Sequence, residues 1–263
     1  MKKIFAKNSS QRIENNLDDD DFIVYHNVKS TKNKAPYIIF SHGLMSDKNS
    51  SKALAIEEYC VEKDLNYIRY DNFGSGESSG DFPDQNMSSW LAGLKMVIDQ
   101  LTTGEVILVG SSKGGWLTLL AALNYPDRIK AIVVISAAVD FTEEAIWEKL
   151  PPNQQQEMRE KGVTEMAGEG DGCDYVVPIS YQLIQDGRKH LLLRKDEIAI
   201  DCPVHLIHGM QDIDVPHSYS MRAAEKIRSS HVITKLVKDG DHRLSRPEDI
   251  RIITNSIEEV MAL

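Results

Sequence analysis

A serine in a tight turn between a strand and a helix is the first candidate for chemistry in this sequence of 263 residues. Residues 110–114 read Gly-Ser-Ser-Lys-Gly, directly after the apolar run 106–109 and directly before a helix-like segment. Glycines on both sides relieve the crowding of so sharp a turn, so the serine hydroxyl projects from the sheet edge. The N-terminus of the following helix favours negative charge that develops there. The pattern predicts Ser112 as a nucleophile.

A second match to the same five-residue pattern lies at residues 76–80. The Asp-Phe-Pro-Asp run after it is unsuited to begin a helix immediately, so we interpret this match as a loop and do not expect Ser78 to react. Residues 71–76 could be taken for a phosphate cradle, but no Gly-Lys-Ser/Thr follows them. A loop near the mouth of the active site is therefore favoured for that segment.

A serine nucleophile needs a base and an acid that orients the base, because the hydroxyl alone is inert near neutral pH. A strand-like segment at 231–237 is followed by a turn that carries His242. Another, at 204–207, is followed by a loop that carries Asp212 and Asp214. Such loops meet at the carboxyl edge of a parallel sheet. The sequence therefore predicts His242 as the base and one of these two aspartates as the acid.

Asp212 is the favoured acid, because it comes directly off the end of its strand. Asp214 would then be an ordinary loop acid. Asp241 is a further rival, but residues adjacent in sequence rarely pair side by side at a turn. The resulting chain order of serine, aspartate and histidine is that of α/β-hydrolases.

Two backbone N–H groups are expected to stabilise the oxyanion of the reaction. One belongs to Lys113, the residue after the nucleophile. The other is expected in the loop after the strand at 38–40, where Leu44 is favoured over Met45 as the donor. We interpret His42 in the same loop as a bracing residue rather than a base. The remaining histidines show no catalytic context: His26, His190, His205, His208, His217 and His231.

Strands and helices alternate over most of the chain and would position these loops. The strand-like runs are 37–40, 67–70, 105–110, 131–135 and 204–207. Alternation with helices is typical of α/β proteins with a mostly parallel sheet and helices on both faces. The first strands, expected at residues 3–7, 10–16 and 22–28, lack intervening helices, so we expect an antiparallel N-terminal edge. At this length, a single domain spanning residues 1–263 is expected.

The alternation lapses between residues 141 and 200, where we expect an inserted lid. A structureless loop of this size is improbable in a compact domain. We therefore expect helices at 143–150 and 152–161, a hairpin around residues 168–172, and a short helix near 178–186. Apolar lid residues could line an acyl site or simply seal the lid onto the sheet. The substrate-binding candidates are Met45, Met158, Val163 and Tyr181.

Composition excludes several classes of protein. The formal net charge of −10 argues against nucleic acid or an anionic membrane surface as a partner. No apolar run approaches the roughly 18 residues of a membrane span. The N-terminal residues predict neither a secretory signal nor a transit peptide, and we interpret the four aspartates at 18–21 as a solvated turn. Scattered cysteines favour reduced thiols in a cytoplasmic protein: Cys60, Cys173 and Cys202.

The chain resembles the abhydrolase-domain-containing protein ten group of α/β-hydrolases over about residues 20–260. The motifs that carry the resemblance lie at residues 52–58, 110–117, 161–163, 208–210 and 241–243. The resemblance implies an α/β-hydrolase fold and acyl-protein thioesterase or acyl-glucuronide esterase activity. It also implies the triad already selected, Ser112, Asp212 and His242.

Two residues depart from the pattern of this group. Lys113 replaces the usual apolar residue beside the nucleophile, and its ammonium could attract an anionic substrate or point to solvent. His42 stands where the animal members carry proline. Those members are mitochondrial, but the N-terminus here shows no presequence. The resemblance therefore implies a bacterial, cytoplasmic member.

These observations together predict a serine hydrolase of acyl esters or thioesters that requires no cofactor and no metal. Its substrate would be a small molecule or an acylated protein. A peptidase or lyase on the same scaffold is one alternative, for which Glu165 and Glu169 are the suggestive lid acids. A non-catalytic ligand-binding protein with a hydrolase fold is the alternative from another class.

Overall fold

The computed structural model describes residues 10–15, 18–32, 35–170 and 173–263. Within these residues, eight strands form one sheet in the order β1-β2-β4-β3-β5-β6-β9-β10, and two strands form a separate hairpin. The strands are β1 (Gln11–Asn15), β2 (Asp18–Val28), β3 (Tyr37–Ser41), β4 (Asn66–Tyr70), β5 (Val106–Ser111), β6 (Ile129–Ile135), β7 (Val163–Gly170), β8 (Cys173–Ser180), β9 (Val204–Gly209) and β10 (Val232–Val237). In the large sheet, β2 pairs antiparallel with β1 and β4, and the other pairs are parallel. The mostly parallel sheet with an antiparallel N-terminal edge is therefore confirmed.

The central strands β3, β5 and β6 are buried almost throughout their length. Successive side chains of a strand point to opposite faces of the sheet, so each strand contributes to two cores. Ile38 and Phe40 of β3 belong to one core, and Ile39 belongs to the other. Apolar runs without polar interruption are typical of parallel strands that are covered on both faces.

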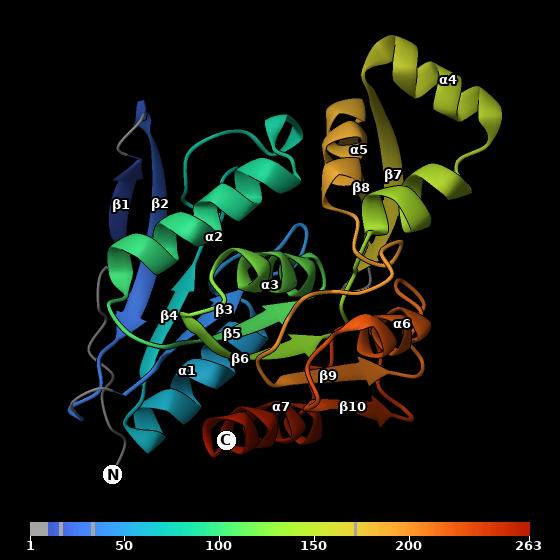
Figure 1. Ribbon diagram of the computed structural model, residues 1–263. Helices are drawn as coiled ribbons and strands as arrows, with labels where there is room; N and C mark the ends of the chain where they lie inside the picture. The colour runs from blue at the N-terminus through green and yellow to red at the C-terminus, as the bar shows by residue number, and fades with distance from the viewer. Residues whose placement is uncertain (1–9, 16–17, 33–34, 171–172) are drawn as a thin grey trace.

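Helices cover both faces of the sheet, as the alternation predicts (Figure 1). One face carries α1 (Ser51–Lys63) and α7 (Pro247–Met261), and the other carries α2 (Met87–Leu101), α3 (Lys113–Asn124) and α6 (Ser218–Lys226). A short 3-10 turn, η1 (Phe82–Asp84), precedes α2. None of the described helices combines the length and apolar character needed to cross a membrane.

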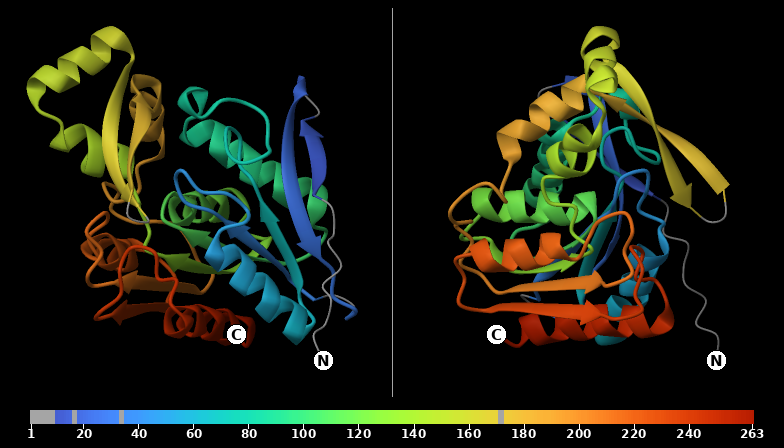
Figure 2. Two further views of the ribbon diagram at one scale, coloured as in Figure 1. Left: turned by 180° about the vertical axis from the view of Figure 1, so that it is seen from behind. Right: turned by 90° about the vertical axis from the view of Figure 1, so that its right-hand side faces the viewer.

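The segment between β6 and β9, residues 136–203, interrupts the alternation and is called the insertion below. It contains η2 (Thr142–Ile146), η3 (Trp147–Lys149), α4 (Pro152–Lys161), the β7–β8 hairpin, α5 (Tyr181–Gly187) and η4 (Arg188–His190). The insertion lies above the same end of the sheet as α6, and its hairpin projects from the body of the molecule (Figure 2). The hairpin and α4 follow the sequence prediction. The helix expected at 143–150 is instead a π-helical turn followed by a 3-10 turn.

The N-terminal region differs from its prediction. β2 begins at Asp18, which pairs with Asn15 across a register shift, so residues 18–21 open a strand. The solvated turn expected there is wrong. Aspartate is disfavoured in strands, but pairing between β1 and β2 overrides that local preference. The strand expected at residues 3–7 lies outside the described residues.

Candidate active site

Ser112 occupies the sharp turn between β5 and α3. Its backbone has φ +55° and ψ −120°, a conformation that a non-glycine residue adopts only when its surroundings impose it. The Ser112 N–H donates to the Ile135 carbonyl at 2.9 Å, which pins the turn to β6. A Cβ at Gly114 would lie 2.1 Å from the Ser41 carbonyl oxygen, so only glycine fits there. The glycine of the motif therefore lets α3 start directly against β3.

His242 lies between Ser112 and Asp212, although 130 residues separate it from the serine. Its Nε2 is 3.1 Å from Ser112 Oγ, and its Nδ1 is 2.7 Å from Asp212 Oδ2. Because a carboxylate only accepts, Nδ1–H donates to Asp212 and Nε2 is left to accept the serine proton. The structure thus brings together the three residues selected from the sequence, in the order that base catalysis needs.

Asp212 is buried and is held as a carboxylate by its hydrogen bonds. Burial raises its pKa, but hydrogen bonds from His208 and His242 outweigh burial and bring the pKa well below its usual range. The other carboxylate oxygen accepts the backbone N–H groups of Asp214 and Val215, at 3.0 and 2.8 Å. A carboxylate with these four donors keeps its charge and its orientation when the imidazole beside it becomes cationic.

His208 is a member of this network that the sequence analysis missed. Its Nε2 is 3.0 Å from Asp212 Oδ2 and 2.9 Å from the Val215 carbonyl, and its Nδ1 is 2.7 Å from Ser220 Oγ. The Val215 carbonyl can only accept, so Nε2 carries the proton and also donates to Asp212. The available signal was the position of His208, four residues before Asp212 at the end of a buried strand.

The sequence rivals for acid and nucleophile have other partners. Asp241 accepts the Leu244 N–H at 2.9 Å, and Asp214 is exposed. Ser78 Oγ accepts the Val24 N–H at 2.8 Å and donates to the Asp71 carbonyl at 2.7 Å, which makes it a structural residue.

One group of side chains in the described part of the chain has the spacing of a metal site. Ligand atoms of Asp212, Asp214 and His242 lie within 4.8 Å of one another. Two of these three residues, Asp212 and His242, already hydrogen-bond each other next to Ser112. Asp212 and His242 are therefore already engaged in the acid–base network, and the exposed carboxylate of Asp214 lies outside it.

The predicted oxyanion donors lie on either side of Ser112. A Cβ built on Gly43 would be 3.3 Å from Ser112 Cβ and 3.9 Å from its Oγ, so the loop after β3 passes directly beside the nucleophile. Leu44 and Lys113 both line the cavity that contains Ser112. Neither of their N–H groups donates to another of the described residues. Both amides are therefore available to an oxyanion, which stays a prediction for them.

An apolar cavity of about 250 Å³ opens over Ser112 and His242. Its other lining residues are Leu44, Lys113, Ala138, Phe141, Ala145, Ile146, Met166, Val177, Ile179, Asp214 and Val215. Most of the apolar members come from the insertion: η2, β7 and β8 each contribute side chains. The insertion therefore supplies most of the apolar wall of this cavity.

The four substrate-binding candidates do not line this cavity. Met158 is fully buried inside the core, and Val163 is 41% exposed. Tyr181 packs against the Trp147 ring at 5.6 Å. Met45 is half exposed and lines a separate cavity of about 200 Å³ next to Phe82. Apolar character alone did not show which face of each element would turn toward Ser112.

The side chain of Lys113 also differs from its prediction. Its ammonium neither points to solvent nor lies open to an anionic substrate, because the residue is 1% exposed. Nζ lies 4.0 Å from the centre of the Trp90 ring, and it has no hydrogen-bond partner among the residues described. Burial lowers the pKa of Lys113 to about 7.

Comparison with known proteins identifies the fold family. The sequence model of the α/β-hydrolase fold family matches residues 36–169. Human palmitoyl-protein thioesterase ABHD10, mitochondrial, is 36% identical over 89% of this chain and 75% of the relative. The solved structure of mouse ABHD10 has 32% identity and a TM-score of 0.86, covering 97% of this chain and 99% of its own. A solved structure from Agrobacterium vitis S4 has 31% identity and a TM-score of 0.89, with 96% and 98% covered.

The same comparison overturns the predicted location. The bovine, orangutan and human relatives are all named mitochondrial, so the cytoplasmic prediction is wrong by this comparison. Free thiols, on which that prediction partly rested, do not distinguish one reducing compartment from another. The resemblance drawn from the sequence motifs is confirmed: this chain is a hydrolase of the α/β-hydrolase fold family, in the group that includes ABHD10.

Proposed function

We propose that this chain is a serine hydrolase that cleaves acyl esters or thioesters through an acyl-enzyme on Ser112. The observation that carries the proposal is the continuous relay from Ser112 Oγ through His242 to Asp212, with contacts of 3.1 and 2.7 Å. A serine without such a base is inert. Without a fixed acid, part of the imidazole population is in the tautomer that carries the proton on the nitrogen facing the serine, which cannot accept the serine proton.

In the acylation step, His242 Nε2 takes the Ser112 proton while Oγ forms a bond to the acyl carbonyl carbon. The carbonyl oxygen becomes an oxyanion, which the Leu44 and Lys113 N–H groups stabilise. As the bond from the acyl carbon to the leaving oxygen or sulfur breaks, His242 gives the proton to that atom. Asp212 stabilises the imidazolium throughout this step.

In the deacylation step, water takes the place of the leaving group. His242 removes a proton from the water while its oxygen attacks the acyl carbon of the acyl-enzyme. The bond to Ser112 Oγ then breaks and His242 returns the proton to it. The products are a free carboxylic acid and the original enzyme, so no cofactor enters the balance.

The cavity supports an apolar acyl group as the part of the substrate that binds beside Ser112. Its walls include Phe141, Met166 and Ile179, and an acyl chain placed there loses contact with water. Human and mouse relatives are named palmitoyl-protein thioesterases, which supports an acylated thiol as one substrate. We propose that the insertion acts as a lid over the bound acyl group, and that the protein is a single domain.

The test is intact-mass detection of the acyl-enzyme after mixing with acyl esters and thioesters of graded length. The wild type should gain one acyl group and turn over a p-nitrophenyl acyl ester, whereas Ser112→Ala should do neither. Ser78→Ala is the matched control, because it removes the serine hydroxyl from the second match to the five-residue pattern, at residues 76–80. This variant should still form the acyl-enzyme. Full activity of Ser112→Ala would refute the mechanism. Tight binding without any acyl-enzyme in the wild type would favour the non-catalytic alternative.

A further inference from the structure

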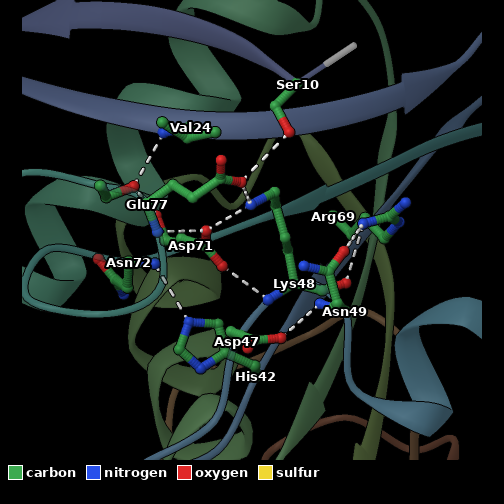
Figure 3. A network of polar contacts seen from close by, with 11 residues as sticks. Ser10, Val24, His42, Asp47, Lys48, Asn49, Arg69, Asp71, Asn72 and Glu77 are labelled. Atoms are coloured by element: carbon green, nitrogen blue, oxygen red, sulfur yellow. Dashed lines mark hydrogen bonds and ion pairs between the residues drawn. The ribbon is translucent and has the colours of Figure 1, made fainter. Parts of the chain in front are cut away.

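The loop after β3, residues 42–48, carries the proposed oxyanion donor Leu44 and is called the oxyanion loop here. Its two ends are joined to two consecutive residues, Asp71 and Asn72, which follow β4 (Figure 3). β3 and β4 are parallel neighbours, so both loops leave the same edge of the sheet. The contacts at each end show what holds Leu44 in place.

The C-terminal end of the loop is held by Asp71 through Lys48. The Lys48 N–H donates to Asp71 Oδ1 and the Lys48 ammonium donates to Asp71 Oδ2, both at 2.7 Å (Figure 3). Asp71 is 0% exposed and Lys48 is 2% exposed. A buried ion pair with such complete hydrogen bonding fixes geometry tightly, because moving either partner leaves an uncompensated charge.

The N-terminal end of the loop is held by His42. The Asn72 N–H donates to His42 Nε2 at 3.1 Å, and His42 Nδ1–H donates to the Gly43 carbonyl at 2.8 Å. Burial, together with the nearby charge of Lys113, lowers the pKa of His42 to about 3. The imidazole therefore stays neutral, and Nε2 keeps its acceptor role at any ordinary pH.

The glycine-rich segment that resembled a phosphate cradle serves the carboxylate of Asp71 instead. The Glu77 N–H donates to Asp71 Oδ2 at 2.9 Å. A Cβ on Gly76 would lie 2.3 Å from the carboxylate, and Gly76 has φ +55°, so glycine is required there on both counts. The negatively charged group that this segment surrounds is therefore the Asp71 carboxylate, not a bound phosphate.

Between its two ends, the oxyanion loop is only partly buried, with Leu44 packed against the core and Met45 turned outward. Met45 has φ +51° and is 50% exposed, so an unfavoured backbone conformation persists without burial of the side chain. The position of Leu44 therefore depends on the two attached ends as well as on its own contact with the core. Of these, the Lys48 end carries more hydrogen bonds and a full charge pair.

We propose that Asp71 and Lys48 are positioning residues for the oxyanion site, which hold the Leu44 N–H where the transition-state oxygen develops. This inference rests on the proposed function. A pair that merely stabilises the fold would change the melting temperature and leave the chemistry of the folded enzyme unaltered. A positioning pair changes the transition state selectively, because an oxyanion donor acts only when charge develops.

The test compares two inhibitors that differ only in whether they form an oxyanion. An alkyl trifluoromethyl ketone adds to the serine and places an oxyanion in the site, whereas the matched methyl ketone binds without addition. In folded Lys48→Met, kcat should fall about 10–100-fold, since complete loss of one oxyanion donor costs ~10²–10³. The inhibition constant of the fluoroketone should rise by the same factor. KM and the methyl ketone constant should stay within about twofold of the wild type.

Glu77→Gln is the matched control, because its side chain contacts the same ammonium but is 61% exposed. It should leave kcat and both inhibition constants unchanged. Lys48→Met leaves a buried carboxylate without its cation, so the double variant Lys48→Met/Asp71→Asn covers the case in which the single variant does not fold. The double variant should show the same loss of kcat.

The outcomes separate this inference from the proposed function. Wild-type kcat and fluoroketone affinity in folded Lys48→Met or in the double variant would overturn the positioning role. An equal loss of affinity for both ketones would also overturn it, because that result marks a general distortion of the site. If instead Ser112→Ala retained full activity, the proposed function itself would fail, whatever the behaviour of Lys48.

Discussion

The two sides of Ser112 are built from different interactions. On the acid–base side, the buried carboxylate of Asp212 receives donors from His208, His242, Asp214 and Val215. The insertion side meets Ser112 through an apolar cavity wall. Two buried hydroxyl groups of the insertion have no hydrogen-bond partner in the described part of the chain: Ser136 Oγ and Thr142 Oγ1.

This difference teaches how the two halves of the site tolerate change. Hydrogen bonds are directional and fail within a few tenths of an ångström, so the acid–base side fixes the geometry of the reaction. Apolar contacts fix the volume of the cavity and tolerate substitutions of similar size. Substitutions on the acid–base side should therefore affect the rate for every substrate. Substitutions on the insertion side should affect the choice of acyl group.

Asp212→Asn should have the largest effect on activity. The amide would offer its N–H to His242 Nδ1 and stabilise the wrong tautomer, which in serine-protease triads lowers kcat by about 10⁴-fold. Steady-state turnover of a p-nitrophenyl acyl ester measures this loss. Asp214→Asn, two residues away and exposed, is the control and should retain most activity. Comparable losses in the two variants would contradict the assignment of the acid.

Lys113→Met should stabilise the fold. A pKa of about 7 instead of 10.5 means that the charged form is destabilised in the folded protein below pH 7, by an amount on the order of a few kcal/mol. We therefore expect a gain of a few kcal/mol in the free energy of unfolding.

The pH dependence of this gain has a definite sign. Between pH 7 and 10.5 the unfolded wild type binds more protons at Lys113 than the folded protein, so wild-type stability rises with pH. The advantage of Lys113→Met should be greatest below pH 7 and vanish near pH 10.5. Urea denaturation at pH 6, 8 and 10 measures it. A lower stability of the variant at pH 6 would show that the ammonium has a partner after all.

His208→Gln should lower kcat by about 10–100-fold. A hydrogen bond to a charged group contributes roughly 1.5–3 kcal/mol, and its loss lets the Asp212 carboxylate turn away from His242. His217→Gln, in the loop that follows Asp212, is the control and should leave kcat unchanged. A loss of activity in His208→Gln that was confined to long acyl substrates would contradict the assignment of His208 to the acid–base side.

Ile179→Ala should have the smallest effect and should depend on the substrate. Ile179 lines the cavity from β8, so its truncation removes contact with a long acyl chain but not with an acetyl group. A few-fold fall in kcat/KM is expected for a long acyl ester, in line with ~1 kcal/mol of lost apolar contact. Equal falls for acetyl and long acyl esters would show that this wall positions the reaction as well.

The acid–base side was readable from the sequence because its signals are local. A glycine-flanked serine between a strand and a helix, and polar loops at strand ends, place Ser112, Asp212 and His242 at one sheet edge before any packing is known. The alternation of strands and helices is likewise a local pattern, and it predicted the mostly parallel sheet. His208 was missed, because its contacts with Asp212 and Val215 depend on the conformation of the loop after β9.

The insertion side could not be read in the same way. Met166 and Ile179 reach the cavity because of the register of the β7–β8 hairpin, where Thr164 pairs with Ile179. That register is a tertiary property, and shifting it by one residue would turn every side chain to the other face. Met158 is as apolar as Met166 and yet lies in the core. The direction of the Lys113 side chain is likewise set by Trp90 on a different helix.

The pairing of β6 with β9 has a consequence for transferring the insertion from one related protein to another. Ile132 pairs with Val204 and Ile135 with Ile207, so the insertion leaves one strand and returns to its immediate neighbour. Its two attachment points are therefore fixed by the sheet, whatever lies between them. A chimera that carries the corresponding segment of ABHD10 would keep its reactive centre intact and acquire the donor's preference among acyl chains.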